Sequence, residues 1–237
     1  MSNLRPPVKW HGGKYYLSSR IIAEFPKDYI NLTYVDAYGG AGSILINKEP
    51  SKVEIYNDIN CDLVNFFKVL RDNSEELIKK LSLTPYSEKE FGFLTNDLNI
   101  ENLFVDNIEW ARQFFVMCRQ SIGGRGDAFS YTLHRSRRGM ADVVSGYLSA
   151  IDTELPRIVN RLREVLILCR PALEVIEMYD SSNTLHYLDP IYLPDVRKSK
   201  KVYKHEMTEE DHWKLAEILH SIKGKCILSG YPSILYD

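Results

Sequence analysis

The sequence predicts an α/β protein in which a parallel, Rossmann-like sheet is interrupted by a mainly helical insertion. Strand-like and helix-like segments alternate in residues 1–71 and again in residues 161–237. A glycine-rich turn follows the first expected strand, and an acidic residue follows the second. Residues 72–160 lack this alternation and are typical of helices, with a basic hairpin near residues 119–140. We therefore expect a divided α/β domain that carries an inserted second domain.

The first α/β stretch contains two short strands, each followed by glycine or polar residues. Its expected elements are, in order, a helix over 15–25, a strand over 33–37, a helix from about 43, a strand over 53–56 and a helix over 62–70. Gly39-Gly40-Ala41-Gly42 ends the first strand, and Asn57-Asp58 ends the second. In a parallel sheet these two strand ends lie at the same edge, where α/β proteins place their ligands.

The insertion combines helices with one irregular, basic stretch. Its expected helices are, in order, one capped by Ser87 and Glu90, one over 109–118 and one from Pro156 to Glu164. Residues 120–139 have no helix signal and are rich in glycine and arginine. Within them, residues 129–133 alternate between apolar and polar side chains, which indicates a strand of the basic hairpin.

The α/β pattern resumes after the insertion. The expected elements are a strand over 165–169, a helix over 172–179, a strand over 184–188, a helix that ends at 221 and a strand over 226–228. Thr208 and Asp211 have the spacing of a capping box, so they should begin the last helix.

Composition excludes several classes of protein. The 237 residues are 44% hydrophobic and 26% charged, which is ordinary for a globular chain and not for a disordered one. No apolar run approaches the ~18 residues that span a bilayer, and the first residues have no apolar stretch suited to secretion. The cysteines are widely spaced and form no CxxC pair, so we expect reduced thiols in a cytoplasm and no metal site.

The charge distribution is more informative than the net charge of −2. The stretch from Arg119 to Arg138 contains five arginines and a single acid, Asp127. The stretch from Arg197 to Lys204 contains five basic residues and no acid. A single run of this kind is usually a solvated face. Two runs in a weakly acidic protein favour a polyanionic partner modestly.

The glycine-rich segments have three alternative interpretations as nucleotide-binding motifs. Gly12-Gly13-Lys14 lacks the remaining P-loop positions, because Val8 and Tyr15 stand where that loop needs glycine and a hydroxyl residue. A dinucleotide fingerprint that begins at Gly40 requires a third glycine at Leu45. A nucleoside ligand without phosphates, such as S-adenosylmethionine, fits a glycine turn followed by an acid that accepts ribose hydroxyls. A tight turn with a helix cap explains the same residues about equally well.

Leu188-Asp189-Pro190-Ile191-Tyr192 places a carboxylate, a proline and an aromatic ring at the end of an expected strand. This is the edge of an α/β sheet where chemistry is usually found. Taken alone, an Asp-Pro turn with a packed tyrosine is an equally good interpretation.

The order and spacing of these segments resemble the Dam-type family of N6-adenine DNA methyltransferases, in the alpha-group motif order. The resemblance extends from about residue 5 to the end of the sequence. Its motifs are Lys9-Trp10-His11-Gly12-Gly13-Lys14, Tyr34-Val35-Asp36-Ala37-Tyr38-Gly39-Gly40-Ala41-Gly42-Ser43, Asn57-Asp58-Ile59-Asn60, Gln120-Ser121-Ile122-Gly123-Gly124, Leu155-Pro156-Arg157-Ile158, Asp189-Pro190-Ile191-Tyr192, His205-Glu206-Met207-Thr208 and Ser229-Gly230-Tyr231.

The resemblance implies a methyltransferase that uses S-adenosyl-L-methionine, acts on adenine in double-stranded DNA and works in the cytoplasm of a bacterial or phage-infected cell. By motif match, the cofactor site would be lined by Trp10, Lys14, Asp36, Gly39, Asp58 and Asp189. Asp189, Pro190 and Tyr192 would be catalytic, since the Asp189 carboxylate and the Pro190 carbonyl accept the N6 hydrogens and Tyr192 stacks on the flipped base. The expected DNA contacts are Arg119, Arg125, Arg135, Arg137, Arg138, Lys198 and Lys200. GATC is the recognition sequence by analogy.

Two departures from the family pattern lead us to expect impaired activity. Ile191 replaces the second proline of the catalytic motif, and the sequence ends at Asp237, where the family usually continues with further strands. A catalytically silent, DNA-binding relative is therefore the alternative hypothesis. A third hypothesis is an enzyme of the same fold that acts on a free small molecule, and the basic insertion argues against it.

Overall fold

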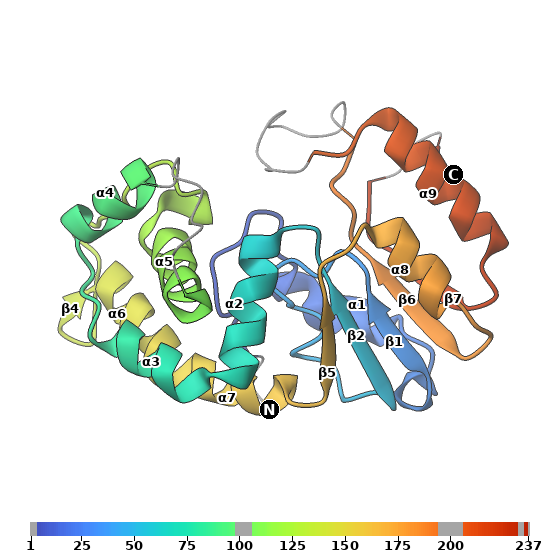
Figure 1. The fold of residues 1–237 in the computed structure, drawn as a ribbon, viewed down its shortest axis with the longest axis horizontal. Helices are drawn as coiled ribbons and strands as arrows, with labels where there is room; N and C mark the ends of the chain where they lie inside the picture. The colour runs from blue at the N-terminus through green and yellow to red at the C-terminus, as the bar shows by residue number, and fades with distance from the viewer. Residues whose placement is uncertain (1–3, 98–105, 194–205, 232–234, 237) are drawn as a thin grey trace. The chain divides into compact units, whose positions relative to one another are not determined.

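The computed structural model describes residues 4–97, 106–193, 206–231 and 235–236 (Figure 1). The chain divides into two compact units. The helical unit contains Met1–Tyr15 and Asn65–Arg163, and the sheet unit contains Tyr16–Val64 and Glu164–Asp237. The first residues of the chain therefore group with the insertion, whereas the sequence assigned them to the α/β domain.

A five-stranded sheet forms the centre of the sheet unit, in the order β5-β2-β1-β6-β7. Its strands are β1 (Thr33–Asp36), β2 (Val53–Asn57), β5 (Val165–Leu168), β6 (Thr184–Leu188) and β7 (Lys225–Leu228). All neighbouring pairs are parallel. The short, almost fully buried β1 and β6 are typical of a sheet covered on both faces. The predicted Rossmann-like fold is confirmed.

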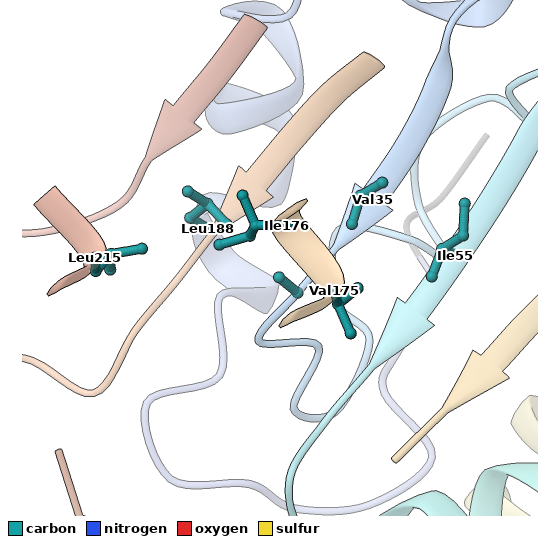
Figure 2. Packing of buried hydrophobic residues seen from close by; sticks show 7 residues of the cluster. Val35, Ile55, Val175, Ile176, Leu188 and Leu215 are labelled. Atoms are coloured by element: carbon teal, nitrogen blue, oxygen red, sulfur yellow. The ribbon is translucent and has the colours of Figure 1, made fainter. Parts of the chain in front are cut away.

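The two faces of the sheet are covered differently. On one face, α8 (Ala172–Tyr179) and α9 (Glu209–Ser221) pack on the strands through a core of buried aliphatic side chains. Figure 2 shows its members Val35, Ile55, Val175, Ile176, Leu188 and Leu215. On the other face, Phe25 follows α1 (Ser18–Ala23) and lies 5.9 Å from the Tyr34 ring and 6.3 Å from the Tyr187 ring, between ring centroids.

The start of α9 shows how local sequence determines a helix boundary. The Asp211 backbone N–H donates to Thr208 Oγ1 at 3.2 Å, and the Thr208 N–H donates to Asp211 Oδ2 at 2.8 Å. Both bonds of the predicted capping box are therefore present, and they satisfy backbone donors that the first helical turn leaves free.

The helical unit is built from short helices around an aromatic core. Its elements are α3 (Ser74–Ser82), α4 (Glu88–Asp97), α5 (Asn107–Gln120), the 3-10 turn η3 (Ile122–Gly124), the hairpin strands β3 (Ser136–Arg137) and β4 (Met140–Ala141), α6 (Asp142–Ser149), the π-helical turn η4 (Ala150–Glu154) and α7 (Leu155–Leu162). Helix α2 (Cys61–Asp72) begins in the sheet unit and ends in this one. Phe66, Phe115 and Tyr147 are buried, and the Phe66 and Phe115 rings stack at 5.8 Å.

The prediction of a helix from Ser43 is wrong, because residues 43–47 form a series of turns. The Asn47 side chain donates to the Ser43 carbonyl at 2.9 Å, while the Asn47 backbone N–H bonds to Ile44 at 3.1 Å. An asparagine side chain thus takes the acceptor that a helix would offer to the backbone. Pro50 follows directly and is unsuited to a continuing helix.

The predicted basic hairpin is present, but its strands lie later than expected. Residues 130–133 are not a strand, and the Phe129 ring packs against Tyr86 at 5.3 Å and Phe91 at 5.8 Å. The hairpin pairs β3 with β4 across Arg138-Gly139. Both turn residues have positive φ, 54° and 75°, as a two-residue hairpin loop requires. The contacts of the Phe129 ring with Tyr86 and Phe91 therefore override the apolar–polar alternation.

Candidate active site at the carboxyl end of the sheet

Three carboxylates gather where β1, β2 and β6 end. Asp36 is the last residue of β1 and is level with Tyr56 on β2 and with Tyr187 on β6. Asp58 comes two positions after Tyr56, and Asp189 comes two positions after Tyr187. Parallel register thus brings the three acids to one edge, beside the point where the chain crosses from one half of the sheet to the other.

Asp36 is the most buried of the three acids. Burial, then the nearby Asp189 carboxylate, raise the pKa of Asp36 well above its usual range, and Asp58 adds to the rise. The Tyr34 hydroxyl donates to Asp36 Oδ2 at 3.3 Å. Within the described part of the chain, buried Oδ1 has no hydrogen-bond partner. A buried acceptor of this kind is unfavourable unless a ligand donor reaches it.

Tyr34 is a site residue that the sequence analysis missed. Its signal was available, because residues two apart on a strand point to the same face, so Tyr34 and Asp36 are neighbours on β1.

The glycine turn after β1 is held by Tyr56 and Asp58. A Cβ on Gly39 would lie 2.2 Å from the Tyr56 ring, so only glycine fits there. Gly40 has a φ of 48°, and its N–H donates to Asp58 Oδ2 at 2.9 Å. The other oxygen of Asp58 accepts the Asn60 N–H at 2.8 Å. Asp58 therefore shapes the turn in addition to any contact with a ligand.

The segment after β6 folds back on its own acid. The Tyr192 hydroxyl donates to Asp189 Oδ1 at 3.2 Å and lies 3.2 Å from Ser229 Oγ. The Tyr231 and Tyr192 rings form a T-shaped pair with a centroid distance of 5.2 Å. Pro190, within this segment, is buried. The structure therefore assembles Asp189, Pro190 and Tyr192 with two residues that follow β7.

Trp10 and Lys14 belong to the helical unit, whereas the other predicted cofactor residues belong to the sheet unit. The Trp10 ring lies 6.2 Å from the Phe114 ring. The Gly13 N–H donates to the Trp10 carbonyl at 3.2 Å, and Lys14 Nζ donates to the Gly12 carbonyl at 3.0 Å. This motif is a tight turn within its own unit, whereas Asp36, Gly39, Asp58 and Asp189 share the sheet edge.

Arg119, one of the predicted DNA contacts, is engaged inside the helical unit. Its Nε donates to the Pro7 carbonyl at 2.7 Å and its Nη2 to the Pro6 carbonyl at 2.8 Å. Burial lowers the pKa of Arg119 to about 10. This guanidinium holds the N-terminal segment in place, and its contact with DNA stays a prediction.

The remaining predicted DNA contacts differ in setting. Arg135, Arg137 and Arg138 are exposed on and beside the β3–β4 hairpin. Arg125 Nε lies 3.2 Å from Asp127 Oδ2 in an exposed pair, which contributes little to stability. Lys198 and Lys200 lie outside the described residues.

Among the residues that the structure describes, no helix is long and apolar enough to cross a membrane.

Comparison with known proteins identifies the family. Residues 10–235 match the D12 class N6 adenine-specific DNA methyltransferases. The chain is 25% identical over 241 residues to the Type II methyltransferase M.MjaIII of Methanocaldococcus jannaschii. The matched residues make up 92% of this chain and 80% of that protein. It is 24% identical over 247 residues to the DNA adenine methylase of Salmonella typhi, covering 99% and 84%.

A shorter and closer match is the Type II methyltransferase M1.LlaDCHI of Lactococcus lactis subsp. cremoris, at 36% over 80 residues, or 34% of this chain and 27% of that protein. The family predicted from the motifs is thereby confirmed. With a family match over nearly its whole length and the acids of its motifs together at one sheet edge, the chain belongs to the D12 class N6 adenine-specific DNA methyltransferases.

Proposed function

We propose that this chain transfers a methyl group from S-adenosyl-L-methionine to N6 of a flipped adenine in double-stranded DNA. The observation that supports it best is the meeting of Asp36, Asp58 and Asp189 at the carboxyl end of adjacent parallel strands. The family match supports the same chemistry. The cytoplasm of a bacterial or phage-infected cell, where DNA is accessible, is the proposed compartment.

The sheet edge fits a cationic nucleoside ligand. S-adenosylmethionine carries a positive sulfonium and an ammonium group, and it supplies the methyl group for the reaction. Asp36 Oδ1 is a buried acceptor, and the carboxylates of Asp58 and Asp189 raise the pKa of Asp36 further. A positive ligand relieves this repulsion, and the Asp58 carboxylate is suited to ribose hydroxyls. Gly39 gives the backbone room to approach the ligand, and Trp10 and Lys14 keep a proposed cofactor role from their motif alone.

The residues after β6 are suited to activating an amine. Adenine N6 is a poor nucleophile, because its lone pair is delocalised into the ring. The Asp189 carboxylate and the Pro190 carbonyl each accept a hydrogen bond from one N6–H. These two bonds return electron density to the nitrogen and aim its lone pair at the methyl group. The Tyr192 ring offers a stacking face for the flipped base. Transfer would then be direct: the methyl–sulfur bond breaks as the N6–methyl bond forms, S-adenosylhomocysteine leaves, one N6 proton is released to water, and no covalent intermediate forms on the protein.

The test is methylation of duplex DNA by the purified chain with isotopically labelled S-adenosylmethionine. N6-methyladenine is measured by mass spectrometry after digestion, on GATC-containing duplex and on unmethylated genomic DNA. Labelled N6-methyladenine is the expected product. DNA binding without methylation would favour the catalytically silent relative, and methylation of free nucleosides alone would favour the small-molecule enzyme.

Asp58→Asn is expected to weaken cofactor binding about tenfold in a folded protein. The amide keeps one oxygen acceptor but loses the charge, and charge-assisted hydrogen bonds are stronger by ~1–1.5 kcal/mol than neutral ones. Asparagine is preferred to alanine, because its one oxygen keeps one of the two backbone bonds, to Gly40 or to Asn60, that Asp58 makes. Calorimetric titration with S-adenosylmethionine measures the effect. Asp28→Asn, before the amino end of β1, is the matched control, and equal affinity in both variants would remove Asp58 from the cofactor site.

Replacing Arg135, Arg137 and Arg138 together by alanine is expected to weaken DNA binding and to flatten its salt dependence. Each lost phosphate contact lowers the slope by roughly one unit. The measurement is the dissociation constant across a series of salt concentrations. A matched loss of three exposed charges elsewhere in the same unit, Lys68, Lys79 and Lys89, controls for net charge. Equal slopes in the two triple variants would mean that the hairpin arginines only form a solvated face.

A further inference from the structure

We propose that Ser229 is a positioning residue, which holds the Tyr192 ring in place when the substrate amine takes over the Asp189 carboxylate. The proposal deepens the proposed function and rests on it. It assigns a task to a residue that does not itself touch the reacting atoms.

The sheet determines where Ser229 lies. Leu188 on β6 and Leu228 on β7 are register partners, so the residues that follow them, Asp189 and Ser229, leave the sheet side by side. The Ser229 N–H donates to the Leu188 carbonyl at 2.8 Å, which extends the ladder by one bond. Ser229 is therefore placed by backbone bonds that do not depend on its side chain.

The Tyr192 hydroxyl lies equally far from a carboxylate oxygen and from the hydroxyl of Ser229. The Tyr192 hydroxyl oxygen is 3.2 Å from Asp189 Oδ1 and 3.2 Å from Ser229 Oγ. A hydroxyl has one proton, which rotates to the better acceptor. While Asp189 is available, that acceptor is the carboxylate.

The proposed chemistry gives Asp189 a second donor. When one N6 hydrogen of the flipped adenine binds Asp189 Oδ1, it competes with the Tyr192 hydroxyl for that oxygen. Ser229 Oγ then becomes the acceptor for the Tyr192 hydroxyl, so the ring keeps its orientation and continues to stack on the base. The Tyr231 ring, in a T-shaped contact with the Tyr192 ring at a centroid distance of 5.2 Å, supports the same orientation.

Ser229→Ala is expected to slow single-turnover methylation about three- to tenfold, the range that one neutral hydrogen bond supports. Cofactor affinity and the thermal midpoint of unfolding should stay unchanged. Ser229→Thr, which keeps the hydroxyl, should restore the rate. Ser221→Ala, an exposed hydroxyl on α9, is the matched control.

A double-mutant cycle separates positioning from a general structural effect. In a Tyr192→Phe background the hydroxyl that Ser229 holds is absent, so Ser229→Ala should cause no further loss. An equal loss in both backgrounds would overturn the proposal.

A spectroscopic readout tests Ser229 without methyl transfer. Tyrosine labelled with ¹³C at the ζ carbon gives a resonance for Tyr192, which is assigned by its disappearance in Tyr192→Phe. Ser229→Ala should shift this resonance, whereas Ser221→Ala should not. An unmoved resonance overturns the role of Ser229 whether or not the protein methylates DNA. A shifted resonance in a protein that never methylates DNA would leave the contact established and overturn the proposed function instead.

Discussion

Asp189→Ala is expected to reduce methyl transfer at least about a hundredfold while DNA binding survives. Removal of one preorganised group that stabilises developing charge typically lowers the rate by about 10²–10³. Asp189 is the only carboxylate of the three that follows β6 directly into the Pro190–Tyr192 segment. The exposed arginines proposed to contact DNA belong to the other unit, so the substitution removes none of the proposed phosphate contacts.

The variant should also fold, for an electrostatic reason. Asp36 has a raised pKa in the folded protein, so its ionisation weakens the fold as the pH rises above the ordinary aspartate value of 3.8. Asp189 is the second cause of this shift, after burial. Its removal relieves repulsion but also takes away the acceptor of the Tyr192 hydroxyl, so stability at neutral pH should change little.

Single-turnover methylation and a DNA-binding isotherm, both for Asp189→Ala, provide the measurement. Asp189→Asn is the control, since it keeps one oxygen acceptor and should retain intermediate activity. Full turnover in Asp189→Ala would contradict the catalytic assignment. Loss of DNA binding with loss of turnover would show that Asp189 acts through the fold.

Ile191→Pro is expected to raise the methylation rate by about three- to a hundredfold. A residue that precedes proline is held in the extended region, so a second proline would restrict ψ of Pro190. That angle aims the Pro190 carbonyl, the proposed acceptor of one N6 hydrogen. The entropic part of the effect is about 0.4–1 kcal/mol, and correct aim adds to it, since roughly 1.4 kcal/mol is tenfold in rate.

The measurement is again single-turnover methylation of duplex DNA, with cofactor affinity as a second readout that should not move. Ile191→Val is the control, because it changes the side chain but keeps the backbone N–H and the freedom of Pro190. Equal rates for Ile191→Pro and the wild-type chain would mean that restraint at this position does not limit the reaction. Inactivity of both, with DNA binding intact, would favour the silent relative.

Some features follow from sequence alone because their causes are local. The Thr208–Asp211 capping box, the helix that it begins and the strands before Asp58 and Asp189 depend on residues a few positions apart. Parallel register then brings the strand ends together, so the meeting of the acids at one edge was predictable from the order of strands and turns. The family was also identifiable, because its motifs are short and ordered along the chain.

Other features are decided only when distant residues meet. Arg119 belongs to one of the two basic stretches of the sequence, yet its guanidinium binds carbonyls 112 and 113 positions away. Phe129 alternates like a strand residue, but its ring packs against Tyr86 and Phe91, and its backbone makes only an isolated bridge to Ser121. Periodicity records which side chains avoid water, and it does not record what they meet there. The partners of Arg119, Phe129 and Ser229 depend on the packing of whole elements, which only the tertiary structure determines.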